Sequence, residues 1–180
     1  MHRMQRIAVI GCGGSGKTRL ANRIGSTLQL PVVHIDGFYW RDIAGVGRVE
    51  STPDEWAATH RALIAATSWV LDGMKLQTLA ARLEAVDRVI FLDLPTWSCV
   101  WGVLSRRIHS HTSVRPDLGT FDVGISREFL AWIVSFRRKH RPRILSLLAS
   151  CSCDVVVLRS RADVRRFEAS LPSMPHRLAA

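Results

Sequence analysis

Residues 7–18 constrain this chain more than any other stretch, because they join a buried strand to a glycine-rich loop. The apolar run Ile7–Ile10 predicts a strand, and it leads directly into Gly11-Cys12-Gly13-Gly14-Ser15-Gly16-Lys17-Thr18. This octapeptide fits the pattern G-x-x-x-x-G-K-[ST] at every fixed position. Glycines let the backbone curl so that its N–H groups point inward, where they bind phosphate oxygens.

The residues that end this loop supply the remaining contacts to a nucleotide. In such loops the lysine, here Lys17, reaches the β- and γ-phosphates, and the following hydroxyl, here Thr18, ligates Mg²⁺. A helix begins at the loop and adds its positive end to the anion site, because apolar side chains recur at Leu20, Ala21, Ile24 and Leu28. The sequence therefore predicts a nucleoside-triphosphate site.

Strands and helices alternate along the rest of the chain. Apolar runs predict further strands at 31–36, 68–73, 89–93 and 154–158, and amphipathic patterns predict helices at 53–64, 76–86, 96–108, 126–148 (broken at Pro142) and 160–171. This order predicts an α/β fold with a five-stranded parallel sheet flanked by helices. The 180 residues fit a single domain, 1–180, with a core over residues 6–170 and a frayed tail over 172–180.

Composition excludes several classes of protein. No apolar run approaches the ~20 residues that a membrane span needs, and the first strand begins too early to leave room for a signal peptide. The four cysteines lack the spacing of a zinc site and are too few for a disulfide scaffold. Cys151 and Cys153 are either a redox pair or, as we interpret them, an incidental pair in a loop. These features predict a cytoplasmic protein without membrane contact.

Asp36 and Trp40 follow the second predicted strand, at the sheet edge where open α/β sheets bind ligands. Asp36 can orient an acceptor hydroxyl, act as its base or help to hold Mg²⁺, while Trp40 can stack on a ring or cap the core. Residues 42–51 predict a loop, and Thr52-Pro53-Asp54-Glu55 predicts a capping box that starts a helix. We expect residues 37–67 to form a flap over the second substrate.

Asp72 and Asp93 close the third and fourth predicted strands. A carboxylate at this position beside a phosphate loop holds Mg²⁺ or its water. Asp72 is the leading metal candidate because Gly73 follows it, whereas Leu94-Pro95 follows Asp93.

The second half of the chain predicts a lid. The helix at 96–108 carries Trp97, Val100, Trp101 and Leu104 on one face, which we interpret as core. Residues 109–125 then lose periodicity and are polar, which is typical of a lid. Five Lys and Arg side chains lie within residues 137–143. We expect one or two of these arginines to face the phosphates, and the others to be a solvated helix end.

The layout resembles the adenylate-kinase group of phosphate-loop kinases and, within it, the bacterial DNA topology modulation protein family. The resemblance spans residues 6 to about 168. It rests on Gly11–Thr18, His34-Ile35-Asp36 with Trp40, Trp69–Gly73, Phe91–Pro95, Arg115-Pro116-Asp117, Glu128–Ile133 and Arg141–Leu145.

The resemblance implies ATP and Mg²⁺ as cofactors, with Lys17, Thr18 and Asp72 at the phosphates. It also implies catalytic arginines on the lid side, for which the nearest positions are Arg106, Arg115, Arg137 and Arg141. Adenylate-kinase-like proteins follow the Asp-Gly pair with an arginine that grips the acceptor's phosphate, whereas here Gly73 is followed by Met74 and Lys75. Lys75 substitutes only as a point charge, without the bidentate fork of arginine. This departure argues against a nucleoside monophosphate as the acceptor.

Two functions follow from these patterns. The first is a kinase, monomeric or homodimeric, that transfers the γ-phosphoryl group of ATP to a nucleotide or another small acceptor, with Asp36, Trp40, Gly73 and Lys75 on the acceptor side. The second is an ATP-binding and ATP-hydrolysing regulatory protein associated with DNA. The net charge of +10, from 25 Lys+Arg and 15 Asp+Glu, favours anionic partners of either kind.

Overall fold

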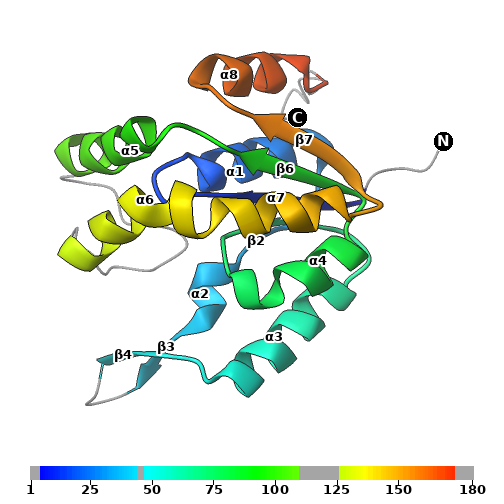
Figure 1. Cartoon of the computed structure of the whole chain (residues 1–180). Helices are drawn as coiled ribbons and strands as arrows, with labels where there is room; N and C mark the ends of the chain where they lie inside the picture. Colours follow the sequence, from blue (N-terminus) through cyan, green and yellow to red (C-terminus); the bar gives the residue numbers. More distant parts are fainter. Residues whose placement is uncertain (1–4, 44–46, 110–125, 173–180) are drawn as a thin grey trace, which may run out of the picture.

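The computed structural model describes residues 5–43, 47–109 and 126–172, and its centre is a five-stranded parallel sheet (Figure 1). The strands stand in the order β2-β5-β1-β6-β7, so the strand that leads into the glycine-rich loop is the middle one. Their bounds are β1 (Arg6–Gly11), β2 (Val32–His34), β5 (Trp69–Asp72), β6 (Arg88–Leu92) and β7 (Asp154–Leu158). The predicted fold class is therefore confirmed.

Burial on both faces explains why the central strands read as continuous apolar runs. Ala8, Val9 and Ile10 of β1 are fully buried, as is Phe91 of β6. Each neighbour pairs with β1 in parallel: Val9 lies opposite Asp72 of β5, and Gly11 opposite Leu92 of β6. This register brings Asp72, Gly11 and the residues after Leu92 to the same carboxyl edge of the sheet.

Helices cover both faces of the sheet. In Figure 1, α1 and α8 lie on one face, and α3, α4 and α7 on the other, as right-handed crossovers from a central first strand require. The described helices are α1 (Lys17–Leu28), α2 (Ile35–Tyr39), α3 (Pro53–Ala65), η1 (Leu76–Thr78), α4 (Leu79–Ala85), α5 (Thr96–His109), α6 (Arg127–Lys139), α7 (Arg141–Ala149) and α8 (Arg161–Ser170). None of them is long and apolar enough to cross a membrane.

The helix ends that local sequence signals predict are present in the structure. The capping box at the start of α3 is present, with the Thr52 side chain accepting from the Glu55 N–H and the Glu55 carboxylate accepting from the Thr52 N–H. The helical stretch at 126–148 is divided near Pro142, because α6 ends at Lys139 and α7 begins at Arg141.

The segment after β2 differs from its prediction in two ways. The strand ends at His34, so Asp36 lies in the short helix α2 rather than at the end of a strand. Residues 42–51 are not a simple loop, because β3 (Trp40–Ile43) and β4 (Gly47–Glu50) pair in an antiparallel hairpin. Neither Trp40–Ile43 nor Gly47–Glu50 is an apolar run in the sequence, so the sequence pattern did not predict these two strands.

Two further expectations are wrong, the first of them in part. The apolar stripe of α5 is core only in part: Val100 packs against the core, whereas Trp97, Trp101 and Leu104 are exposed, with exposed fractions of 73%, 63% and 39%. All four line an open apolar pocket. Cys151 and Cys153 are joined by a disulfide rather than forming an incidental pair of thiols. Residues 110–125, most of the predicted lid, and the tail from 173 lie outside the described residues.

Candidate active site

The loop between β1 and α1 has the backbone geometry of an anion cradle. Gly14 and Gly16 adopt left-handed conformations with φ of +74° and +94°, which residues with a β-carbon rarely adopt. Helix α1 begins at Lys17 with Gly16 as its N-cap, no side chain caps it and its first turn holds no acidic residue. Its first N–H groups are therefore available to phosphate oxygens.

The polar side chains of the loop complete this cradle. The Lys17 ammonium folds back over the loop and donates to the Cys12 carbonyl at 2.9 Å. Thr18 follows it at the first turn of α1 and is half-buried. The Ser15 hydroxyl is buried without a hydrogen-bond partner among the described residues. These residues fit a magnesium-bound nucleotide, since Lys17 can exchange one carbonyl for phosphate oxygens.

Neighbouring helices press closely on the outside of the loop. A β-carbon on Gly14 would lie 2.2 Å from the Cys99 carbonyl oxygen of α5, and one on Gly13 would lie 2.7 Å from the Phe129 ring of α6. Phe129 in turn stacks on Trp132 with ring centroids 6.0 Å apart. The variable positions of the motif are thus glycine for a tertiary reason as well as for the curl of the backbone.

Basic side chains surround the loop, and their charges affect the pKa of the buried thiol of Cys99. Cys12 and Cys99 are both buried, and a hydrogen bond between them together with burial raises the pKa of Cys12. The pKa of Cys99 is lowered, first by the hydrogen bond with Cys12 and then by the charges of Lys17, Arg161 and Arg137. The printed contacts agree: Lys17 donates to the Cys12 carbonyl, Arg161 donates to the carbonyls of Gly14 and Ser15, and Arg137 donates to the Leu94 carbonyl.

Asp72 and Gly73 lie beside the loop at the end of β5. Only 4% of Asp72 is exposed, and its carboxylate contacts Nδ1 of His34 at 3.1 Å. Gly73 has φ of +130°, and a β-carbon there would lie 2.2 Å from Cγ1 of Ile35. Glycine therefore lets the chain turn tightly past α2 after the carboxylate.

The acceptor side brings a cation, carboxylates and aromatic rings together. The Lys75 ammonium lies 3.2 Å from the centre of the Tyr39 ring and 5.6 Å from that of Trp40. Burial lowers the pKa of Lys75, and the charges of Asp36 and Glu50 oppose this shift. Tyr39 donates to Glu50 at 2.8 Å. Four predicted acceptor-side positions, Asp36, Trp40, Gly73 and Lys75, thus fall in one region, lined by α2, the hairpin and the turn after β5.

Arg82 is a residue of this region that the sequence patterns did not single out. It is fully buried; Nη1 donates to the Gly73 carbonyl at 3.0 Å, Nε donates to Nε2 of His60 at 3.3 Å, and Nη2 has no described partner. Burial lowers the pKa of Arg82 to about 10, opposed by the charges of Asp36 and Asp72. One signal was present in the sequence: Arg82 interrupts the apolar face formed by Leu79 and Leu83.

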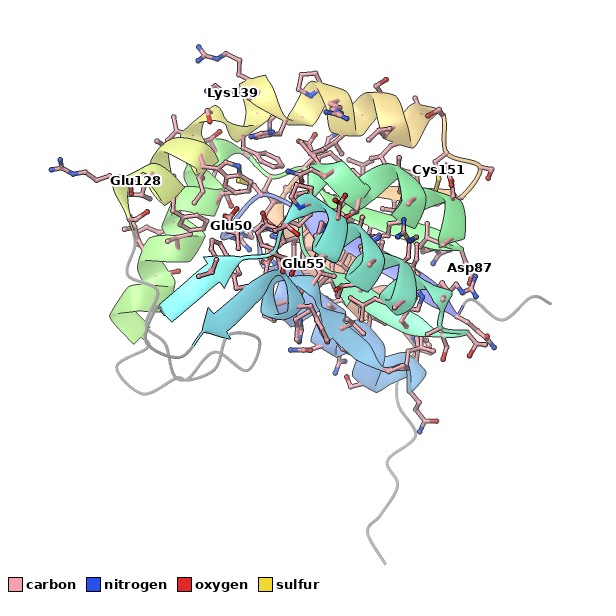
Figure 2. All side chains as sticks on the ribbon, turned by 90° about the horizontal axis from the view of Figure 1, so that it is seen from below. Glu50, Glu55, Asp87, Glu128, Lys139 and Cys151 are labelled. Carbon is pink, nitrogen blue, oxygen red and sulfur yellow. A yellow bond between two sulfur atoms is a disulfide. The ribbon has the colours of Figure 1, made fainter. Side chains whose placement is uncertain are left out.

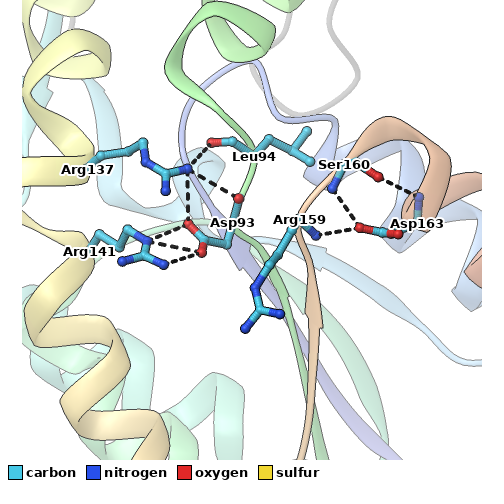
Figure 3. Close-up of polar contacts among 7 residues, drawn as sticks. All are labelled: Asp93, Leu94, Arg137, Arg141, Arg159, Ser160 and Asp163. Carbon is cyan, nitrogen blue, oxygen red and sulfur yellow. Dashed lines mark hydrogen bonds and ion pairs between the residues drawn. The ribbon is translucent and has the colours of Figure 1, made fainter.

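Arg141 and Arg137 meet at Asp93, the rival carboxylate (Figure 3). Arg141 grips Asp93 with three hydrogen bonds of 2.7–3.0 Å, and the Asp93 side chain is only 3% exposed. Arg137 is held more loosely, with 3.2 Å to the Leu94 carbonyl and 3.6 Å to the Asp93 carboxylate, and 39% of its side chain is exposed. Arg137 is therefore freer to meet a phosphate than Arg141.

The remaining basic residues are dispersed. Arg138, Lys139 and Arg143 are exposed, and Figure 2 shows Lys139 extending away from α6. Arg106 is exposed near the end of α5. Arg115 lies outside the described residues.

The overall architecture matches that of solved kinases. Shikimate kinase from Acinetobacter baumannii, solved in complex with shikimate, aligns with a TM-score of 0.57 and 12% identity over 93% of this chain and 90% of that one. Shikimate kinase from Bacteroides thetaiotaomicron aligns with a TM-score of 0.57 and 13% identity, over 93% of this chain and 96% of that one. A sugar kinase from Janibacter sp. aligns with a TM-score of 0.47 and 16% identity, over 92% of this chain and 93% of that one. The chain matches no family model and no curated protein sequence.

The likeness to the two shikimate kinases shows that this chain shares their fold. Neither shikimate kinase is described as a topology modulation protein, so the resemblance to that family stays a prediction.

Proposed function

We propose that this protein is an ATP- and Mg²⁺-dependent kinase that phosphorylates a small molecule. One observation carries the proposal: a phosphate loop with left-handed Gly14 and Gly16 lies at the same sheet edge as Asp72, beside a region that holds Asp36 and Lys75. Ligands of open α/β sheets bind at this edge. The kinase fold supports the same reading.

At the nucleotide, the chain supplies binding and charge. The N–H groups of Gly11–Thr18 and the start of α1 bind phosphate oxygens, and Lys17 leaves the Cys12 carbonyl to reach the β- and γ-phosphates. Thr18 and Asp72 would hold Mg²⁺, which neutralises charge on the transferred group. Arg137 adds positive charge from α6; we assign Arg106 and Arg115 the same role as predictions from the resemblance.

At the acceptor, Asp36 orients the hydroxyl and accepts its proton. The half-buried carboxylate stands in the first turn of α2, where its charge acts on both Lys75 and Arg82. Lys75 lies on the aromatic face of Tyr39 and holds the acceptor as a point charge. A polyhydroxylated or anionic acceptor suits these groups, and shikimate, the ligand of one aligned kinase, belongs to this chemical class.

Calorimetry with Mg-ADP and Mg-ATP tests nucleotide binding, and a panel of hydroxylated acids, sugars and nucleotides tests transfer by product mass. We expect Lys17→Ala to abolish transfer, because the cation at the β- and γ-phosphates is lost. Lys139→Ala is the matched control, since Lys139 is exposed at the end of α6. Nucleotide hydrolysis without any phosphorylated product across the panel would count against a kinase.

The DNA-associated alternative depends on the exposed cations Arg138, Lys139 and Arg143. It is the weaker proposal, because Arg137 and Arg141 of the same cluster turn to Asp93. It predicts duplex affinity that falls steeply between 50 and 200 mM salt, as phosphate contacts release counterions. Fluorescence anisotropy with a labelled duplex decides this, and affinity independent of salt excludes it.

A further inference from the structure

Arg161, the first residue of α8, reaches across the sheet edge to the phosphate loop. Its Nη1 donates to the Ser15 carbonyl at 2.9 Å, and its Nη2 donates to the Gly14 carbonyl at 3.0 Å. The same guanidinium donates to Ser98 of α5, from Nη2 to the carbonyl at 3.1 Å and from Nε to the hydroxyl at 3.1 Å. All four acceptors are neutral oxygens, so the contact orients backbone groups rather than pairing charges.

The start of α8 fixes the position from which Arg161 acts. The Ser160 hydroxyl accepts from the Asp163 N–H at 3.0 Å, and the Asp163 carboxylate accepts from the Ser160 N–H at 2.8 Å (Figure 3). This capping box sets where the helix begins and thus the direction in which its first side chain leaves. Arg161 is half-buried, which restricts the guanidinium further.

The planar peptide bond transmits this contact to the inside of the loop. In a trans peptide the N–H points opposite to the C=O. Holding the Gly14 and Ser15 carbonyls on the outside therefore turns the N–H groups of Ser15 and Gly16 inward. The Cys12 carbonyl marks that interior, because it accepts from the Ser15 N–H at 3.3 Å and from Lys17 at 2.9 Å.

Helix α5 and the loop also pack closely around this contact. A β-carbon on Gly102 of α5 would lie 2.1 Å from the Gly14 carbonyl oxygen and 2.9 Å from Nη2 of Arg161. A β-carbon on Gly16 would lie 3.2 Å from Nη1. The phosphate loop, helix α5 and the Arg161 guanidinium are therefore in close contact, and glycine at positions 16 and 102 makes this contact possible.

We propose that Arg161 is a positioning residue for the phosphate loop: it holds two loop carbonyls away from the nucleotide and thereby presents the opposing N–H groups to the phosphates. It touches no phosphate itself. A loop organised before binding pays less ordering cost when the nucleotide arrives. Without Arg161, either peptide can flip and turn a carbonyl oxygen toward the anion. The inference rests on the proposed nucleotide site and adds a residue from the far end of the chain.

Calorimetric titration of the full chain with Mg-ADP tests the inference. Arg161→Met removes both the positive charge and the planar guanidinium, whereas Arg161→Lys keeps the charge but loses the bidentate donor geometry of the guanidinium. Arg165→Met, on the exposed side of the same helix, is the control. We expect the dissociation constant to rise roughly tenfold in both Arg161 variants, which corresponds to about 1.4 kcal/mol, and not in the control. Titrations are made below each variant's unfolding temperature, which is measured separately.

The outcomes separate the two proposals. If the unaltered protein does not bind Mg-ADP, the proposed function fails. If it binds, and the folded Arg161 variants bind within twofold of it, the inference is overturned even where their unfolding temperatures fall, because Arg161 then only stabilises the fold. If Arg161→Met does not fold, Arg161→Lys decides by the same criterion.

Discussion

The ion pair between Arg141 and Asp93 gives the sharpest prediction, because the resemblance implies a different role for the same arginine. Arg141 makes three charge-assisted hydrogen bonds to a carboxylate that is 97% buried. Replacing Arg141 by Met leaves that carboxylate without its main partner. Removing one member of a buried pair costs about 3–5 kcal/mol.

For Arg141→Met we expect a loss of stability at the lower end of this range. Arg137 remains 3.6 Å from Asp93 and compensates in part, and 28% of the Arg141 side chain is exposed to water. We therefore expect Arg141→Met to lower the free energy of unfolding by about 3 kcal/mol, or the midpoint of thermal unfolding by roughly 10 °C. Arg138→Met, an exposed neighbour on α6, is expected to stay within about 0.5 kcal/mol of the unaltered protein.

Urea unfolding followed by tryptophan fluorescence measures both variants, and a double-mutant cycle with Asp93→Asn isolates the coupling between the two side chains. Titration with Mg-ADP is made alongside and is expected to give an unchanged dissociation constant for Arg141→Met. A variant that unfolds normally but binds nucleotide much more weakly would refute this reasoning, because Arg141 would then act at the phosphates.

Two further predictions concern the acceptor side. The pKa of His60 is lowered from 6.5 to about 4, first by burial and then by the charge of Arg82. His60 is therefore neutral in the folded protein, and unfolding becomes easier as the pH falls below about 6.5. We expect the free energy of unfolding to drop by about 2 kcal/mol between pH 7 and pH 5 from this group. Urea unfolding at both pH values shows this loss, and a His60→Phe variant with the same pH dependence would contradict it. Gly73→Ala combines a left-handed φ with a clash against Ile35, whereas Gly47→Ala has a φ of +89° and its new β-carbon meets no atom of the described residues within 4 Å. We expect Gly47→Ala to cost about 1 kcal/mol and Gly73→Ala at least about 2 kcal/mol more, from the clash. Equal unfolding midpoints in urea would show that the turn relaxes without cost.

On the acceptor side, several structural features could not be predicted from sequence patterns. Asp36 is predicted as an acceptor-side residue because it follows an apolar run, but the pattern did not predict α2, whose single buried residue is Ile35. The hairpin was not predicted because Trp40–Ile43 and Gly47–Glu50 show no regular alternation of apolar residues in the sequence, although their backbones pair, Trp40 with Glu50 and Arg41 with Val49. Arg82 acts through Gly73, nine residues earlier, and His60, in a different helix.

The outer face of α5 illustrates a different limit. Helical spacing places Trp97 and Trp101 on one side of the helix, as the sequence indicated. Periodicity defines a face without showing which other element covers it, and among the described residues none buries these two rings.

By itself, the sequence determined the phosphate loop, the five parallel strands and most helix ends, because each depends on residues that are neighbours along the chain: glycines in one octapeptide, apolar runs, and caps within a single turn. Tertiary structure alone decided how the charges are used. Arg161 meets Ser15 across 146 residues and Arg141 meets Asp93 across 48. A guanidinium is chemically suited to a carbonyl, a carboxylate or a phosphate alike, so only the fold, by setting which of these lies within reach, assigns it a role.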